Sequence, residues 1–234
     1  MYDPVETELS YQYLGRLGEK LAKVEWGLVG GWAVYFHVRQ NYQRAFGEDY
    51  LKSRDIDVFI DARDQQVFLQ KITELGFTAS AYNFRYELIY DREEKKIITS
   101  LEARKKHIFH LIYLFLDVFS DQKTTLVGSW VFPELEKGKW KMIESFPVMN
   151  VSLLLHLKVM AFFQREKLDK ELKDACDIYA LLFYSESRVT MTNEIRKAAE
   201  KIISRADLQR YIAEQVLKDP FKEALVVNAL RGLP

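Results

Sequence analysis

The sequence predicts an α+β fold in two parts, an N-terminal mixed sheet flanked by helices over residues 1–148 and a C-terminal helical bundle over residues 149–234. In the first part, segments with the two-residue alternation of strands follow segments with helical spacing. The stretch IFHLIYLFLDVF (108–119) is apolar on both faces, which is typical of a central strand. Beyond Asn150 only helical patterns remain, so we expect the domain boundary near residue 148.

The expected elements of the first part follow from local signals. Aromatic and basic residues recur at helical spacing in 32–46, which indicates a helix. A second helical pattern covers 63–75, and Gly76 is expected to end it. In DIDVFI the apolar Ile56, Val58 and Ile60 share one face, which indicates a strand. We expect helices over 6–23, 32–46 and 63–75, and strands over 24–29, 55–60, 80–91, 95–99 and 108–119.

The second part reads as a series of helices. Helical patterns cover 151–167, 169–184, 192–205 and 207–218. A final helix is expected to start with Asp219 as its N-cap and Pro220 as its first residue, because both residue types favour those positions.

Composition excludes several classes of protein. Hydrophobic residues make up 48% and charged residues 29%, as in ordinary globular proteins, and 34 Lys and Arg balance 34 Asp and Glu. Net charge therefore gives no overall attraction to nucleic acid or membranes. The single Cys176 cannot form an internal disulfide, and the first residues lack a secretory pattern. The longest apolar run, 151–163, is too short to cross a bilayer, so we expect a cytoplasmic protein without a membrane span.

Three aspartates stand in strand segments, where aspartate is uncommon. Asp55 and Asp57 point to the same side of their strand, about 7 Å apart, and Asp117 sits within the apolar 108–119 segment. A charge in such surroundings costs several kcal/mol unless it is paired or binds a metal. Mg²⁺ is the natural candidate because it prefers oxygen ligands. The alternative is that these carboxylates lie at the sheet edge and face water.

A glycine pair precedes the acidic strand. Gly30 and Gly31 end one predicted strand and open the next helix, so their backbone N–H groups can approach a phosphate. Such a pair alone is more often a tight turn. The order strand, Gly-Gly, helix, acidic strand and distant strand aspartate is much more specific.

In Gly30-Gly31, Asp55-Ile56-Asp57 and Asp117 the chain resembles the nucleotidyltransferase superfamily that includes DNA polymerase β, over about residues 24–120. The resemblance implies Mg²⁺ or Mn²⁺ held by the three aspartates, which are then the catalytic residues. It also implies an NTP whose phosphates lie against the glycine pair and Ser53, and transfer of its NMP to an acceptor hydroxyl. The interval from Gly31 to Asp55 is longer than is usual in these relatives, which indicates an insertion beside the nucleotide pocket.

The helical part is similar to AbiEii-type nucleotidyltransferases, the toxins of abortive-infection toxin–antitoxin pairs. The residues that match their signature are Lys158, Arg165, Lys173, Asp174 and Asp177. The likeness implies that the three basic residues contact the nucleotide and that the two aspartates support catalysis. It also implies an RNA acceptor, with the tRNA 3′ end as leading candidate, or a protein acceptor, and an antitoxin partner.

Other interpretations of these residues stay open. Lys158 and Arg165 share one helical face and would also suit a solvated basic stripe, while Lys173 and Asp177 suit an i,i+4 salt pair. The G-G-W opening and the D-x-D strand are also similar to lincosamide and aminoglycoside nucleotidyltransferases, and a non-catalytic nucleotide or RNA binder is a third reading. A basic hairpin over 92–110 suits a polyanionic acceptor or a plain solvated turn.

Overall fold

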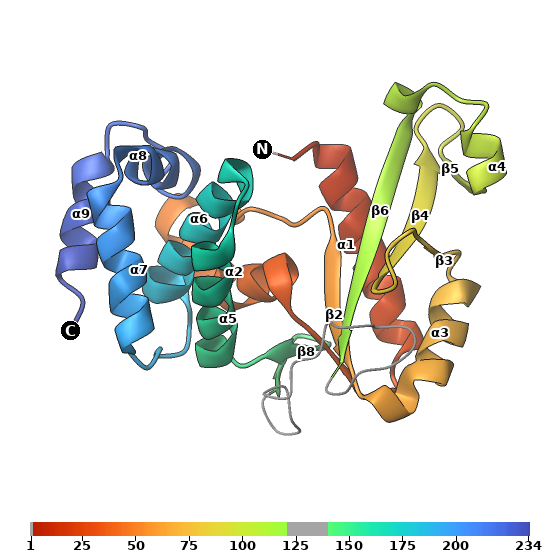
Figure 1. The fold of residues 1–234 in the computed structure, drawn as a ribbon, viewed down its shortest axis with the longest axis horizontal. Helices are drawn as coiled ribbons and strands as arrows, with labels where there is room; N and C mark the ends of the chain where they lie inside the picture. Colours follow the sequence, from red (N-terminus) through yellow and green to blue (C-terminus); the bar gives the residue numbers. More distant parts are fainter. Residues whose placement is uncertain (1, 121–139) are drawn as a thin grey trace. The chain divides into compact units, whose positions relative to one another are not determined.

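The structure, a computed structural model, describes residues 2–120 and 140–234, and it confirms an α+β fold with a mixed sheet and C-terminal helices (Figure 1). The helices are α1 (Pro4–Lys20), α2 (Gly30–Phe46), α3 (Gln65–Glu74), α4 (Ser100–Ala103), α5 (Val151–Gln164), α6 (Leu168–Tyr184), α7 (Asn193–Ser204), α8 (Ala206–Gln215) and α9 (Glu223–Arg231), with short 3₁₀ helices η1 (Ala62–Asp64) and η2 (Ile108–His110). The strands are β1 (Trp26–Leu28), β2 (Ile56–Ile60), β3 (Thr78–Ala79), β4 (Arg85–Asp91), β5 (Lys96–Ile98), β6 (Leu111–Ser120), β7 (Trp140–Ile143) and β8 (Phe146–Met149).

The chain divides into two compact units. The first contains residues 1–32 and 52–148, and the second contains residues 33–51 and 149–234. The division passes through α2, so the glycine pair at the start of this helix belongs to the first unit. Residues 33–51, which the sequence interpretation placed in the N-terminal domain, are grouped with the C-terminal helices.

The sheet of the first unit has the order β3-β4-β6-β2-β1-β8-β7 in the part of the chain that is described, with β5 paired to β4. Strand β6 is parallel to β2 and antiparallel to β4, so it lies inside the sheet, as its apolar faces predict. The β2–β6 register aligns Asp57 with Asp117, and the β4–β6 register aligns Arg85 with Asp117. Three charged residues therefore stand in one row across three neighbouring strands.

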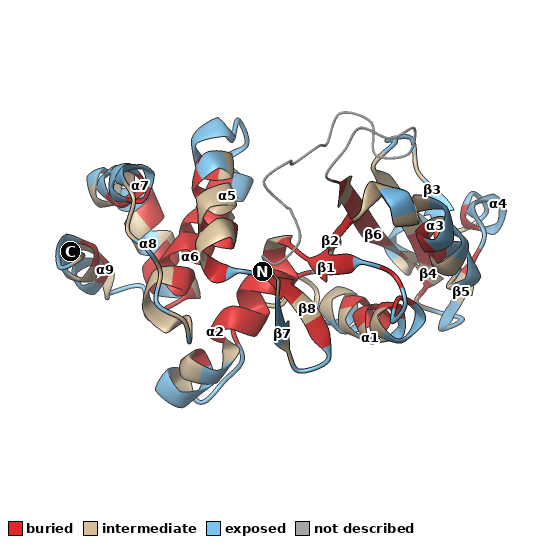
Figure 2. Ribbon diagram, turned by 90° about the horizontal axis from the view of Figure 1, so that it is seen from below, coloured by how far each residue is buried: buried red, intermediate tan, exposed pale blue. Residues whose placement is uncertain are grey.

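The core of the first unit includes the buried side chains of α1 and of the apolar face of β2 (Figure 2). Ile56, Val58 and Ile60 are at most 1% exposed, which confirms the face assigned to them. At the start of α1, Asp3 caps the helix by accepting a hydrogen bond from the Val5 amide at 2.8 Å. The indole Nε1 of Trp32 donates to Ser10 Oγ at 2.9 Å, which satisfies a buried donor.

The second unit is helical, and its polar groups are satisfied inside it. The Tyr42 hydroxyl donates to the Val216 carbonyl at 2.7 Å, and a ring nitrogen of His37 lies 2.7 Å from the Met149 carbonyl oxygen. His37 is 1% exposed, so it is a packing histidine. No helix of residues 2–120 and 140–234 has the length and apolar character needed to span a membrane.

The predicted start of the last helix is wrong. Helix α9 begins at Glu223 after Lys222, whereas Asp219 and Pro220 lie in the preceding turn. The Asp219 carboxylate accepts a hydrogen bond from the Phe221 amide at 2.9 Å, so it closes this turn instead of capping the helix. An aspartate before a proline stabilises a turn as readily as a helix start, and local sequence does not separate the two.

Candidate active site

The glycine corner lies directly against Asp57. Gly30 has a φ of +62°, a left-handed conformation that side chains other than glycine rarely adopt. A Cβ atom on Gly30 would stand 1.9 Å from Asp57 Oδ2, so there is no room for it. The amide of Val29 donates to the Asp57 carbonyl at 3.1 Å, which fixes the corner to β2. Only glycine fits at this position. Because it has no side chain, the N-terminus of α2 can lie against the Asp57 carboxylate.

Asp57 and Asp117 are neighbours across the parallel β2–β6 pair. Residues aligned in this way point to the same face, with backbones about 4.8 Å apart. Asp57 is half-buried and Asp117 is 8% exposed. The sheet therefore brings together, on one face, the two aspartates that the sequence places 60 positions apart, as expected from their strand patterns.

Asp55 and Ser53 precede β2. Asp55 is half-buried, and its Oδ1 lies 3.6 Å from Nε of Arg54. Ser53 is 3% exposed, so its side chain is enclosed in the first unit. The role of Ser53 in nucleotide binding stays a prediction.

Arg85 is the residue of this site that sequence reasoning missed. Its Nε donates to Asp117 Oδ1 and its Nη2 donates to Asp117 Oδ2, each at 2.7 Å, in a two-bond fork. The guanidinium also lies over the Phe115 ring, 4.5 Å from its centroid. The only local signal is a basic residue at the start of a strand, because the register that sets Arg85 beside Asp117 cannot be read from the sequence.

The charge of Arg85 acts on three aspartates, Asp55, Asp57 and Asp117, which together are called the acidic row below. The pKa of Arg85 is raised, first by its hydrogen bonds to Asp117, against the opposing effect of burial, and then by the negative charges of Asp117, Asp55 and Asp57. The last two contributions indicate that the guanidinium lies within electrostatic reach of both β2 aspartates. Arg85 therefore acts electrostatically on all three carboxylates, while Arg54 lies beside Asp55.

A divalent cation fits part of this donor set. Among residues 2–120 and 140–234, no three His, Cys, Asp or Glu side chains are arranged to hold a metal ion. Mg²⁺, however, is commonly held by one or two carboxylates together with substrate phosphates, and Asp55 and Asp57 offer hard oxygen atoms of this kind. Both oxygens of Asp117 accept hydrogen bonds from Arg85. The residues thus fit a cation on Asp55 and Asp57, with Asp117 engaged by arginine.

Three residues of the helical signature, Lys158, Asp174 and Asp177, form a largely buried ion-pair cluster in the second unit, and the more exposed Arg165 pairs with Asp174. Lys158 Nζ lies 3.1 Å from Asp174 Oδ1 and 2.7 Å from Asp177 Oδ2, and Arg165 Nε lies 2.6 Å from Asp174 Oδ2. The Tyr50 hydroxyl donates to Asp177 at 3.1 Å. Two cations and two carboxylates cancel within this cluster, so the solvated basic stripe considered above is wrong for Lys158.

Titration behaviour in this cluster follows from burial and pairing. Burial alone would raise the pKa of Asp174, but the charge of Lys158 and the hydrogen bond from Arg165 lower it below its usual value. For Lys158, burial opposes the charged form, yet the two aspartates raise its pKa. Lys173 is half-buried on the same helix. Nucleotide contact by Lys158, Arg165 and Lys173 stays a prediction.

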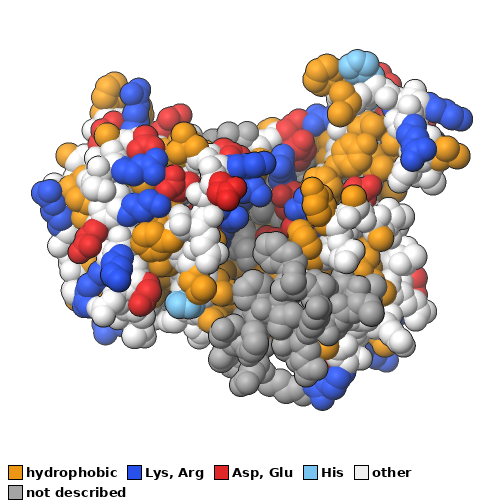
Figure 3. Space-filling view, viewed as in Figure 1, with side chains coloured by type: hydrophobic (Ala, Val, Ile, Leu, Met, Phe, Trp, Pro, Cys, Tyr) orange, Lys and Arg blue, Asp and Glu red, His pale blue; other side chains and the backbone are white. Residues whose placement is uncertain are grey.

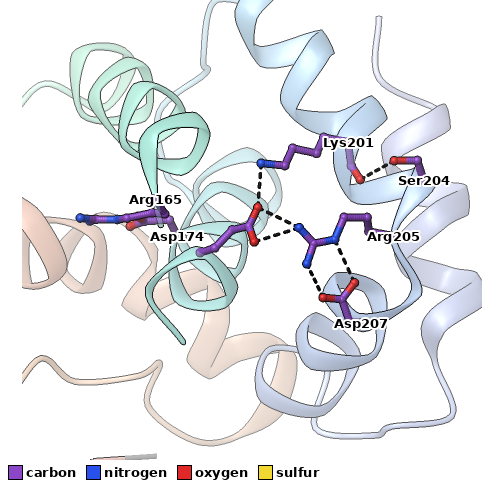
Figure 4. Close-up of polar contacts among 7 residues, drawn as sticks. Arg165, Asp174, Lys201, Ser204, Arg205 and Asp207 are labelled. Atoms are coloured by element: carbon purple, nitrogen blue, oxygen red, sulfur yellow. Dashed lines mark hydrogen bonds and ion pairs between the residues drawn. The ribbon is translucent and has the colours of Figure 1, made fainter. Parts of the chain in front are cut away.

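A second ion-pair cluster, centred on Glu171, stabilises the helices of the second unit (Figure 4). Lys201 Nζ lies 2.7 Å from Glu171 Oε1, and Arg205 Nη1 lies 2.8 Å from Glu171 Oε2. Arg205 also pairs with Asp207. The cluster joins α6 to α7 and to the start of α8, and it was not predicted because its members lie more than 25 positions apart from Glu171.

The basic hairpin of residues 92–110 uses part of its charge internally. Lys106 pairs with Asp91 at 2.8 Å and also with Glu94, and Lys96 pairs with Glu94 at 2.7 Å. Phe109 in η2 is 81% exposed, and hydrophobic and histidine side chains gather at this end of the first unit (Figure 3). Much of the apparent basic cluster is therefore a set of local ion pairs.

Comparison with known proteins adds a likeness of fold. No protein-family model matches the chain, and no curated protein matches it significantly. The structure is similar to that of JHP933 from Helicobacter pylori, with a TM-score of 0.54 and 12% identity over 96% of this chain and 89% of that chain. At this identity the similarity shows a shared fold.

Two further solved structures match more loosely. An antigenic nucleotidyltransferase-like protein from Paracoccidioides brasiliensis matches with a TM-score of 0.49 and 18% identity, over 90% of this chain and 93% of that chain. The lincomycin-bound lincosamide antibiotic adenylyltransferase LnuA matches with a TM-score of 0.40 and 20% identity, over 76% of this chain and 98% of that chain.

Proposed function

We propose that this protein is a nucleotidyltransferase that uses a divalent cation to move an NMP from an NTP to an acceptor hydroxyl. The observation that carries the proposal is the contact between Gly30, in its left-handed conformation, and the Asp57 carboxylate, next to Asp117 on the neighbouring strand. A helix N-terminus that favours anions thus meets carboxylates that favour cations. A nucleoside triphosphate with its bound metal presents both charges.

Each residue has a distinct role in the proposed reaction. Asp55 and Asp57 hold Mg²⁺ or Mn²⁺, and the backbone of Gly30 and Gly31 holds the β- and γ-phosphates. When bound, the cation would supply neutralisation of the negative charge on the phosphates. Asp117 accepts the proton of the acceptor hydroxyl through an oxygen lone pair that Arg85 does not use.

The bond changes of this transfer balance. The acceptor oxygen forms a bond to the α-phosphorus, and the bond from that phosphorus to the bridging oxygen of pyrophosphate breaks. The hydroxyl proton passes to the carboxylate, and pyrophosphate carries away the electron pair of the broken bond. The role of the protein is to position and neutralise, as is general for this chemistry.

The test is transfer of label from NTPs radiolabelled at the α-phosphate, in the presence of Mg²⁺ and total cellular RNA, read on a gel. Asp57→Asn should lower the rate by at least about 100-fold, the scale of losing one group that stabilises transition-state charge. The control is Asp61→Asn, at the other end of β2, where Asp61 caps η1 through the Arg63 amide. Undiminished transfer by Asp57→Asn would remove this residue from the reaction.

The acceptor belongs to the same proposal. We take RNA as the acceptor, with the tRNA 3′ end first and a protein hydroxyl second, and an antitoxin as partner, on the resemblance of residues 156–182 to the AbiEii-type toxins. Parallel incubations with RNA, protein and lincosamide or aminoglycoside antibiotics separate these acceptors. Nucleotide binding that needs no divalent cation and releases no pyrophosphate would instead indicate a non-catalytic binder.

A further inference from the structure

Three carboxylates of one row cannot stay together in a folded protein without a compensating charge. Asp117 is 8% exposed and Asp55 and Asp57 are half-buried, so water screens their repulsion only in part. Among the described residues, Arg54 lies beside Asp55, and the cation paired with Asp117 is Arg85. It approaches from β4, the strand on the far side of β6 from Asp57.

The hold of Arg85 on Asp117 is built into the sheet. Arg85 and Asp117 are aligned in the β4–β6 register, and the amide of Val118 donates to the Phe84 carbonyl at 2.8 Å just beside them. Contact with the Phe115 ring restrains the guanidinium, and its side chain is 25% exposed. A planar, restrained fork loses little freedom on pairing, so the contact is durable.

We infer that Arg85 is an internal counter-cation of the Asp55–Asp57–Asp117 row, and that it limits how tightly this row binds a divalent cation. The inference rests on the proposed function in taking Asp55 and Asp57 of this row as the cation site. Arg85 neutralises a negative charge at Asp117, next to Asp57 on the neighbouring strand. Arg85 lets the carboxylates fold together before a cation arrives, and its positive charge repels that cation once it binds.

The inference predicts a tighter cation site when the positive charge is removed. Arg85→Met keeps an apolar side chain against Phe115 but no charge, and it should bind Mn²⁺ at least about tenfold more tightly. In water, the repulsion between a unit charge and a doubly charged ion reaches about tenfold in affinity when they lie about 6 Å apart, and it is larger where burial lowers the screening. Arg85→Lys keeps the charge and should bind Mn²⁺ like the unchanged protein.

The experiment measures Mn²⁺ binding to the NTP-free protein by isothermal titration calorimetry. A matched control is Arg63→Met, because Arg63 also forms a two-bond fork with an aspartate of the β2 region, Asp61, away from the row. Arg63→Met should leave Mn²⁺ affinity unchanged, whereas Asp57→Asn should abolish tight binding. If Arg85→Met does not fold in cation-free buffer, Arg85→Gln, which can still donate to Asp117, takes its place.

The outcomes separate this inference from the proposed function. Equal or weaker Mn²⁺ binding by the uncharged variants, or tighter binding by Arg85→Lys as well, overturns the role of Arg85. Tighter binding by Arg85→Met in a protein that transfers no label keeps the inference and overturns the transferase proposal. Label transfer that depends on Asp57, together with a Mn²⁺ affinity that Arg85→Met does not change, supports the transferase proposal and overturns the role of Arg85.

Discussion

At the scale of single residues, the site depends on Gly30 more than on any other backbone position described. Its φ of +62°, and an Asp57 carboxylate oxygen only 1.9 Å from where a Cβ atom would stand, leave glycine as the one residue that fits. The sequence predicts that the backbone of the glycine pair binds a phosphate. The structure adds that one of the two glycines is also required by the carboxylate.

Gly30→Ala should therefore reduce both stability and activity. The left-handed backbone costs a non-glycine residue about 1–2 kcal/mol, and the methyl group must displace Asp57 from its place. We expect a lower free energy of unfolding in urea and a loss of label transfer. The matched control is Gly15→Ala in α1, where a Cβ meets nothing within 4 Å. This change should stabilise by about 0.5–1 kcal/mol, and equal effects at both glycines would contradict the account.

At the scale of elements, strand register makes the acidic row. The alternation of DIDVFI puts Asp55 and Asp57 on one face, but only the pairing of β2 with β6 and of β6 with β4 aligns Asp57, Asp117 and Arg85. A slip of one residue would turn Asp117 to the opposite face. The buried alternation of β6 resists such a slip, because it would expose Leu114 and Leu116, which are at most 1% exposed.

Helix α6 leads to a prediction about pH. Asp174 has a lowered pKa in the folded protein because Lys158 and Arg165 outweigh the effect of burial. Such a group stabilises the fold fully above its unfolded pKa of about 3.8, and this contribution is lost as the pH falls through the lower folded value. As the pH falls below about 4, we expect the free energy of unfolding to decrease more steeply for the unchanged protein than for Asp174→Asn.

Urea unfolding from pH 6 downward, for both proteins, measures this difference. At pH 6, Asp174→Asn should already cost about 3–5 kcal/mol, the usual loss when one partner of a buried ion pair is removed. The difference in free energy of unfolding between the two proteins should then become smaller as the pH falls below about 3.8. A gap that stays constant with pH would show that the ionised form of Asp174 is not what stabilises the helices.

At the scale of the whole molecule, charge is balanced and dispersed. The 34 basic and 34 acidic residues sum to zero, and on the face shown in Figure 3 both signs are interspersed over the described surface. Many of them are paired, as in the clusters around Asp174 and Glu171. On this face, a polyanion would thus meet no extended field of positive charge over the described residues.

Generic nucleic acid should accordingly bind weakly. At about 0.15 M salt we expect a labelled duplex of arbitrary sequence to bind more weakly than the 10⁻⁴–10⁻⁶ M that is typical of non-specific nucleic-acid binders. Fluorescence anisotropy measures this affinity. Binding within that range, with a steep dependence on salt, would contradict the charge balance and indicate a basic surface. Weak generic binding means that the RNA acceptor proposed above is selected by local contacts near the reacting hydroxyl.

The sequence by itself determined the fold class and most of the helices, and it predicted the acidic and glycine positions of the candidate site, because hydrophobic period, turn residues and rare strand aspartates are local signals. It did not indicate strands β7 and β8, which precede the C-terminal helices. It did not reveal that Arg85 holds Asp117, or that Lys158 is paired with Asp174 and Asp177. These pairings join residues 32, 16 and 19 positions apart. Only the tertiary structure decided them, because register and helix packing choose which charges become neighbours, and burial then makes each charge require a partner.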